Sequence, residues 1–211
     1  MPRHYTSKKR KVASDRNHLA ILRSAMDVFS EYGYHDANLD IIAARANLSK
    51  GAIYNHFKNK QDLFLSVIEW GEHQLIHQIS ETRKRYTGVV EMIESSMRSY
   101  FRFYEKRESF FRVLVQEKYN FDDSAKERFR MILENLTKEL EFIFQTGIEE
   151  GVIRNIDPHA CALMLSGVAN SLLFSWIHEN SGKKIIDLYK DAVAFVRHGL
   201  YTGSEKAKTC R

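Results

Sequence analysis

Side chains that suit contacts with double-stranded DNA are spaced along residues 38–64, NLDIIAARANLSKGAIYNHFKNKQDLF. Lys50 would lie in the first turn of a helix, where the helix dipole attracts phosphate. Asn55 carries the donor and acceptor pair that can read an adenine edge in the major groove, and Ala52 can contact a thymine methyl group. The other candidate contacts, which would hold backbone phosphates without reading sequence, are Tyr54, His56, Lys58 and Lys60.

Local signals place these side chains on a helix-turn-helix. Asn38 is a good N-cap, and apolar residues at helical spacing follow it, which predicts a helix over 39–46. Asn47 stands where a left-handed turn residue is needed, and Ser49 would cap a second helix over 50–56. The same spacing would also suit a helical hairpin whose polar side chains meet only water.

Charge distribution favours DNA over that alternative. Residues 1–60 hold 11 Lys/Arg and 5 Asp/Glu, a balance of +6, whereas residues 61–211 have a balance of −1. A basic excess confined to one part of the chain favours a polyanionic partner. Residues 1–14 are expected to form a disordered arm that follows a minor groove or a phosphate backbone, or else a solvated tail. Its basic run is Lys8, Lys9, Arg10 and Lys11.

The helix ILRSAMDVFSEYGY (21–34) and the segment IIAARANLSKGAIYNHFKNKQDLF (41–64) together resemble the TetR family of bacterial transcriptional regulators. The resemblance covers residues 16–66. It implies that Ser49 and Gly51, which open the recognition helix, contact phosphate. Family members commonly carry a threonine pair where Ala37–Asn38 stands; Asn38 can still contact phosphate, whereas Ala37 cannot.

The rest of the chain reads as all-α, because apolar residues recur at helical spacing and only Pro2 and Pro158 are prolines. About nine helices are predicted, at 15–32, 39–46, 50–56, 60–85, 88–106, 109–119, 124–150, 158–179 and 184–201. The predicted domains are a DNA-binding domain (15–60), a helical effector-binding and dimerisation domain (61–202) and a polar tail (203–211). Two cysteines without framework spacing indicate reduced thiols in a cytoplasmic protein.

The sequence carries no phosphate-binding loop, nucleophile elbow or reactive-cysteine setting, so we expect neither an enzyme nor a cofactor. His73 and His77 are four residues apart with Glu69 nearby, a spacing that could hold zinc. Solvated helix residues are the favoured interpretation, and a metal-responsive regulator remains an alternative.

Aromatic residues are abundant between residues 97 and 144, a region that in the resembled family encloses an effector cavity. An effector bound there would be bulky and lipophilic or aromatic, and an arginine could hold an anionic head such as that of an acyl thioester. The alternative is a solid core in a DNA-binding dimer without an inducer. The candidate lining residues are Met97, Tyr100, Phe101, Tyr104, Phe111, Phe129, Leu133, Leu172 and Trp176.

Residues 160–177 contain no charged side chain. A helix that is apolar on all sides needs a partner beyond its own domain, and this interpretation is favoured over a membrane span. The resemblance implies a homodimer built on the last two helices. The candidate interface residues are Gly167, Ser171 and Ser175, a stripe of small residues, with Ala192, Phe195 and Val196. A two-fold dimer would fit a palindromic operator. The sequence therefore predicts a dimeric repressor that releases its operator when it binds a small molecule.

Overall fold

The computed structural model describes residues 3–179 and 184–200. Helices form nearly all of this part of the chain, which confirms the all-α class. In chain order they are α1 (Arg3–Asp36), α2 (Leu39–Arg45), α3 (Lys50–Tyr54), α4 (Lys60–Arg83), α5 (Val89–Glu105), α6 (Glu108–Glu117), α7 (Asp123–Glu149), α8 (Pro158–Glu179) and α9 (Ile185–Leu200). Most of their ends lie within two residues of the predicted ones.

The chain forms two compact units, of which the first comprises Met1–Gly71 with Ser109–Phe129 and the second Glu72–Glu108 with Arg130–Arg211. Each of the long helices α4 and α7 therefore contributes residues to both units. The predicted domain boundary after residue 60 stays a prediction. The predicted tail beyond Leu200 lies outside the described residues.

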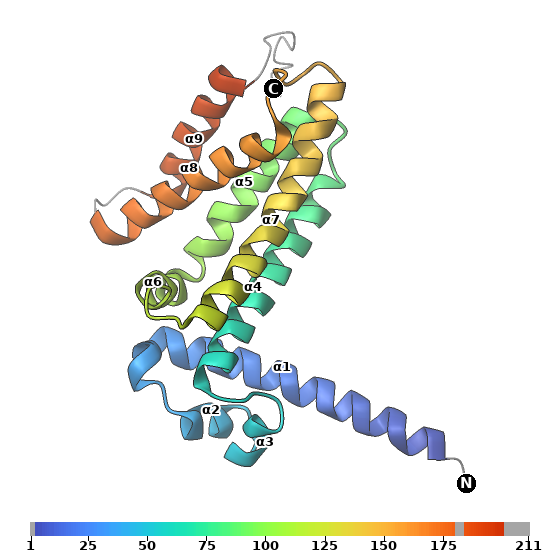
Figure 1. Ribbon diagram of the computed structural model, residues 1–211, viewed down its shortest axis with the longest axis vertical. Helices are drawn as coiled ribbons and strands as arrows, with labels where there is room; N and C mark the ends of the chain where they lie inside the picture. The colour runs from blue at the N-terminus through green and yellow to red at the C-terminus, as the bar shows by residue number, and fades with distance from the viewer. Residues whose placement is uncertain (1–2, 180–183, 201–211) are drawn as a thin grey trace. The chain divides into compact units, whose positions relative to one another are not determined.

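In the first unit, α2 and α3 lie side by side and α2 packs against α1 (Figure 1). Their turn forms as the residue types predict. The Asn38 side chain accepts from the backbone N–H of Asp40 at 2.8 Å, and the Ser49 hydroxyl accepts from that of Ala52 at 3.2 Å. Asn47 has φ 55°, so the left-handed position between the helices is confirmed.

Helix α1 differs from the prediction at its start. It extends back to Arg3, so the basic run 8–11 lies on a helix, whereas the sequence had predicted a disordered arm. The physical reason is that residues 3–14 contain neither Pro nor Gly and are rich in Lys and Arg, which extend an already nucleated helix at low cost. At the other end, Gly33 adopts φ 76° and interrupts the helix near the predicted stop.

An aromatic cluster centred on Phe64 forms the core of the first unit. The Phe64 side chain is fully buried, and its ring centroid lies 4.9 Å from that of Phe29 on α1 and 5.0 Å from that of Tyr34. From α6 and the following turn, the rings of Phe110 and Phe121 approach to 5.7 and 6.2 Å. The cluster therefore ties the first turns of α4 to both α1 and α6.

In the second unit, α5, α8 and α9 pack against one another. Helix α5 is amphipathic, and its buried side chains include Ile93, Met97 and Phe101. Helix α8 begins as predicted, because the Asp157 carboxylate accepts from the Ala160 N–H at 2.7 Å and Pro158 occupies the first helical position.

Helix α8 is exceptional in composition. By length and composition alone, Pro158–His178 is the one helix in the described chain that qualifies as a possible membrane span, with a mean hydropathy of 1.6. Only 33% of this window is buried within the chain. An apolar helix that is mostly uncovered by its own chain needs another apolar surface against it.

Candidate nucleic-acid interface, effector cavity and dimer face

The recognition helix α3 is short and presents an exposed polar face. It ends at Tyr54, two residues before the predicted end, and Asn55 is its C-cap. The chain then turns so that Phe57 is buried, which ends the helix earlier than the spacing of apolar residues indicated. Tyr54 is 53% exposed, and Asn55 and Gly51 are also exposed, so all three are accessible to a groove.

Lys50 lies at the start of α3 but has a partner within the unit. Its Nζ lies 2.9 Å from Oδ2 of Asp40 on α2, and this hydrogen bond raises the pKa of the lysine. The pair is exposed, so a phosphate can compete for the ammonium group. Ala52 is half-buried, which leaves part of its methyl group for a base contact.

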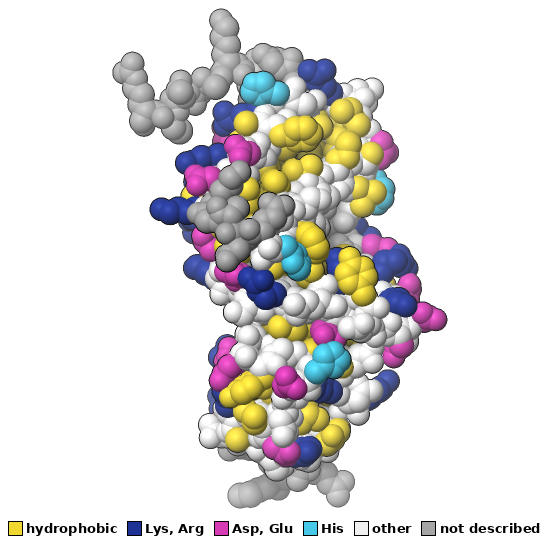
Figure 2. Space-filling model, turned by 90° about the vertical axis from the view of Figure 1, so that its left-hand side faces the viewer, with side chains coloured by type: hydrophobic (Ala, Val, Ile, Leu, Met, Phe, Trp, Pro, Cys, Tyr) yellow, Lys and Arg dark blue, Asp and Glu magenta, His cyan; other side chains and the backbone are white. Residues whose placement is uncertain are grey.

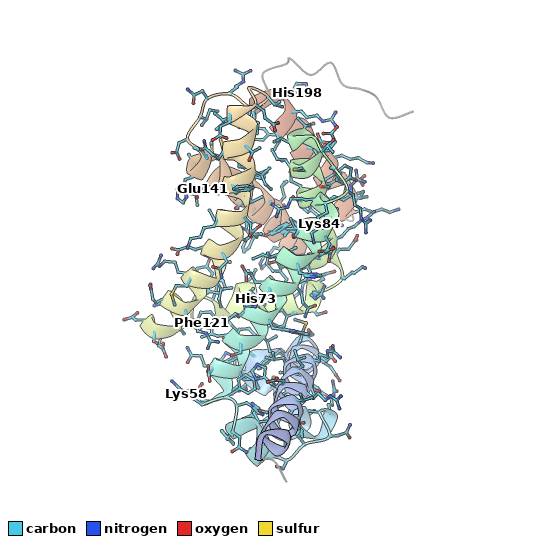
Figure 3. The ribbon with its side chains drawn as sticks, turned by 90° about the vertical axis from the view of Figure 1, so that its right-hand side faces the viewer. Lys58, His73, Lys84, Phe121, Glu141 and His198 are labelled. Atoms are coloured by element: carbon cyan, nitrogen blue, oxygen red, sulfur yellow. The ribbon has the colours of Figure 1, made fainter. Side chains whose placement is uncertain are left out.

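The predicted phosphate-binding residues around α3 differ in the exposure and hydrogen bonding of their side chains. Lys58 is exposed and lies on the loop before α4 (Figure 3). The Lys60 Nζ donates to the carbonyl of His35 at 2.7 Å and lies 5.0 Å from the Tyr34 ring centroid, and burial lowers its pKa. Lys60 therefore fastens the end of α1 to α4, a role that sequence reasoning missed.

His56 is half-buried beside a second histidine. The ring centroids of His18 on α1 and His56 lie 5.5 Å apart, and the His18 ring stacks on Phe57 at 5.0 Å. Burial, followed by the charge of His56, lowers the pKa of His18. The neutral form of His18 is therefore favoured, which limits charge repulsion inside this cluster.

The second unit contains a small cavity with about 320 Å³ of empty space. Helices α4, α5, α7 and α8 all contribute to its wall. The lining residues are Ile79, Ser96, Met97, Tyr100, Leu136, Leu140, Leu165, Ser166 and Ala169. The figure of about 320 Å³ includes space open to solvent, and the enclosed part is about 30 Å³, far below the roughly 300–1,000 Å³ of small-molecule sites, so a ligand of that size would have to displace side chains of the wall.

The cavity wall is almost wholly apolar. The Ser96 hydroxyl donates to the Met92 carbonyl at 2.7 Å, and the Tyr100 hydroxyl donates to Oδ1 of Asn170 at 2.8 Å. Burial raises the pKa of Tyr104, whose ring packs against that of Tyr100, to about 12, and raises that of Tyr100 as well. Both phenols therefore stay neutral, and the wall suits hydrocarbon.

Two of the nine predicted pocket residues, Met97 and Tyr100, line this cavity, and Tyr104 lies directly behind Tyr100. The others lie elsewhere. Phe101 is buried towards α9, with its ring 6.3 Å from that of Tyr189. Phe111 and Phe129 belong to the first unit, Leu133 is exposed, and Leu172 and Trp176 are half-buried away from the cavity. Helical periodicity identified apolar faces but not the neighbours that those faces contact.

The predicted dimer residues fall into an accessible group and a buried group. Gly167, Ser171, Ser175 and Phe195 are exposed or half-buried. Ala192 and Val196 are each only 2% exposed, because they pack inside their own unit, so they leave the candidate interface. Large exposed apolar side chains on the same two helices, which the prediction lacked, are Leu163, Met164, Phe174 and Ile186. Figure 2 shows hydrophobic side chains on the face that carries α8 and α9.

A metal site is not supported in the described part of the chain. His73 and His77 are exposed on α4 (His73 is labelled in Figure 3), and no group of three potential ligands gathers there. Glu69, which lies near them in the sequence, binds Arg128 at 2.8 Å. Cys161 is buried, and Cys210 lies outside the described residues.

Sequence reasoning missed Asp62 and Arg128. The Asp62 N–H donates to Oδ1 of Asn59 at 2.8 Å, and one Asp62 carboxylate oxygen accepts from the Lys58 N–H, also at 2.8 Å. The spacing Asn59-x-x-Asp62 is a capping-box pattern that could have indicated this arrangement. No local signal links Asp62 to Arg128, which is 66 residues further along the chain.

Comparisons with known proteins agree with this geometry. The model of "Bacterial regulatory proteins, tetR family" matches residues 21–67, and that of "Tetracyclin repressor-like, C-terminal domain" matches residues 73–200. The fatty acid metabolism regulator protein of Bacillus subtilis is 22% identical over 185 residues, which cover 87% of this chain and 95% of that protein.

Solved structures share the fold. The fatty acid degradation regulator FadR from Bacillus halodurans gives a TM-score of 0.77 at 20% identity, covering 85% of this chain and 97% of that one. The regulator FadR from Bacillus subtilis, solved in complex with stearoyl-CoA, gives 0.76 at 22% identity, covering 84% and 96%.

Proposed function

Because the chain belongs to the TetR family of bacterial regulatory proteins, we propose that it is a homodimeric cytoplasmic repressor whose palindromic operator is released by a long-chain acyl thioester. The observation that carries the effector part is the apolar cavity between α4, α5, α7 and α8. The hydroxyl groups of Ser96 and Tyr100 are already engaged with protein acceptors and the rest of the wall is almost wholly apolar, so it suits a hydrocarbon chain and not a charged head.

The DNA contacts divide by role. Asn55 and Ala52 read bases, and Lys50 joins them once its ion pair with Asp40 opens. The phosphate contacts are Asn38, Ser49, Gly51, Tyr54, His56, Lys58 and Lys60. Of the two lysines, Lys58 carries the freer charge, because Lys60 also binds the His35 carbonyl.

Two helices connect the effector cavity with the DNA-binding unit. Ile79 of α4 lines the cavity, and the same helix begins at Lys60 in the first unit. Helix α7 contributes Leu136 and Leu140 to the cavity and begins at Asp123 in the first unit. A ligand that displaces either helix would alter the position of the loop that follows α3.

Dimerisation would cover the exposed apolar side chains of α8 and α9, of which Phe195 is 65% exposed. A surface of this kind is uncommon on a monomer and typical of an interface. The operator of a two-fold dimer would be palindromic, with half-sites about 34–36 Å apart.

Replacing Asn55 with Ala is expected to weaken operator binding by about 1–3 kcal/mol and to relax the preference at one base pair per half-site. Asn55 is exposed at the end of α3, so the substitution removes base contacts with little effect on the fold. A selection from a randomised palindromic operator measures the preference. An unchanged base preference would show that Asn55 does not read DNA. Asn135→Ala, an exposed asparagine on α7, is the matched control.

The effector class is tested by thermal unfolding with a series of saturated acyl-CoA thioesters, with free CoA as the control. Saturation at about 100 times the dissociation constant should raise the melting temperature by roughly 5–10 °C, whereas free CoA should have no effect. Ala169→Leu fills the cavity wall from α8 and should abolish the shift while the chain stays folded. If no acyl-CoA raises the melting temperature of the wild-type protein, the alternative of a solid core without an inducer replaces the proposal of an acyl thioester effector.

A further inference from the structure

Arg128, near the start of α7, binds three side chains on one stripe of α4. Its Nη1 lies 2.6 Å from Oδ1 of Asp62, and its Nη2 lies 2.9 Å from the Ser66 hydroxyl and 2.8 Å from Oε2 of Glu69. All four residues belong to the first unit. The Arg128 and Asp62 side chains are 31% and 24% exposed, so solvent screens this pair less than a fully exposed one.

Asp62 joins this ion pair to the loop that follows the recognition helix. While Oδ1 binds Arg128, Oδ2 accepts from the backbone N–H of Lys58 at 2.8 Å. Lys58 lies four residues after Tyr54, the last residue of α3. A single carboxylate therefore receives donors from α7 on one oxygen and from the loop between α3 and α4 on the other.

Arg128 lies on the same helix as two residues of the cavity wall. Leu136 and Leu140, which line the cavity, follow it by 8 and 12 residues in the continuous helix α7. A displacement of α7 that lengthens the 2.6 Å contact with Asp62 by about 1 Å would take it beyond hydrogen-bond range.

We propose that Arg128 is a positioning residue that fixes the Lys58 loop through Asp62 and thereby makes operator affinity depend on the position of α7. The regulatory part rests on the proposed function. The alternative is that Arg128 stabilises the unit without orienting the loop. Arg130, two residues on, belongs to the second unit and pairs with Glu134 on its own helix, so it serves as the control.

The first test is hydrogen exchange of the dimer, followed by mass spectrometry on peptides that cover residues 57–62. Arg128→Gln should increase exchange there about tenfold, Arg128→Lys should restore part of the protection, and Arg130→Gln should change nothing. Peptides from the middle of α7 should exchange as slowly as in the wild type. If Arg128 only stabilised the unit, exchange should increase in those peptides as well. This readout requires neither DNA nor effector.

The second test is a double-mutant cycle on operator affinity. Arg128→Gln and Asp62→Asn should each weaken binding about tenfold without changing base preference. In the Asp62→Asn background, Arg128→Gln should add less than about twofold, because its effect passes through that carboxylate. Unchanged exchange at residues 57–62, or a further tenfold loss in the double variant, would overturn the proposal.

Addition of stearoyl-CoA tests the regulatory part of the proposal. Arg128→Gln should keep the thermal shift of the wild type, because the cavity is intact, yet show a smaller change in operator affinity when the ligand is added. If the wild-type protein does not bind stearoyl-CoA, the proposed effector is contradicted. The role of Arg128 in positioning the loop is then decided by the exchange and affinity measurements. A variant that responds as fully as the wild type would overturn the regulatory role.

Discussion

Phe195→Glu is expected to dissociate the dimer and to lower operator affinity by about 100-fold or more. Phe195 is 65% exposed on α9, within the apolar face shared with α8. Burying a carboxylate against that face without a partner costs several kcal/mol, so the monomer becomes the favoured state. A monomer binds one half-site and loses the gain in effective concentration that linkage provides, roughly 100- to 10,000-fold.

Phe142→Glu provides a matched control for Phe195→Glu. Phe142 is 73% exposed on α7, so both substitutions place a carboxylate at an exposed phenylalanine of the second unit. Sedimentation velocity measures the oligomeric state, and fluorescence anisotropy measures operator affinity. A Phe195→Glu chain that remained dimeric would place the interface elsewhere, as would a Phe142→Glu chain that dissociated.

Phe64→Ala is expected to lower the free energy of unfolding by about 3–5 kcal/mol. The Phe64 side chain is fully buried and touches rings from α1, α6 and the turn before α7, so its removal leaves a cavity at their junction. Operator binding should weaken in parallel, because Phe64 holds the first turns of α4 against α1.

Urea unfolding followed by circular dichroism, at one fixed protein concentration, measures the effect of Phe64→Ala. Phe142→Ala removes a ring of the same size from the surface and should change stability by less than about 0.5 kcal/mol. A Phe64→Ala chain as stable as the Phe142→Ala chain would show that the aromatic cluster does not stabilise the first unit.

The sequence predicted features that depend on near neighbours in the chain. Asn38 and Ser49 cap their helices through residues two and three positions ahead, and Asn47 adopts the left-handed turn, because these arrangements follow from local backbone chemistry. Helix ends were predicted closely for the same reason. The largest difference is the start of α1, at Arg3 and not at residue 15; α3 ends two residues early, where Phe57 turns into the core of the unit.

Features set by distant residues could not be predicted. The spacing of Lys50 gave no sign of its pair with Asp40, ten residues away on α2, and nothing local connects Arg128 with Asp62. The residues that line the cavity could not be predicted for the same reason. Met97 lines it while Phe101, one turn further on the same helix, points towards α9, since the wall is defined by neighbouring helices and not by apolar character alone.

The most direct test of the proposed function is a titration of the dimer, bound to a fluorescent operator selected from random DNA, with stearoyl-CoA. The proposal predicts that saturation with the ligand raises the operator dissociation constant at least tenfold, a coupling free energy of about 1.4 kcal/mol. Free CoA should leave the constant unchanged. If stearoyl-CoA stabilises the chain in thermal unfolding while operator affinity stays within about twofold, the account of a ligand-released repressor is contradicted.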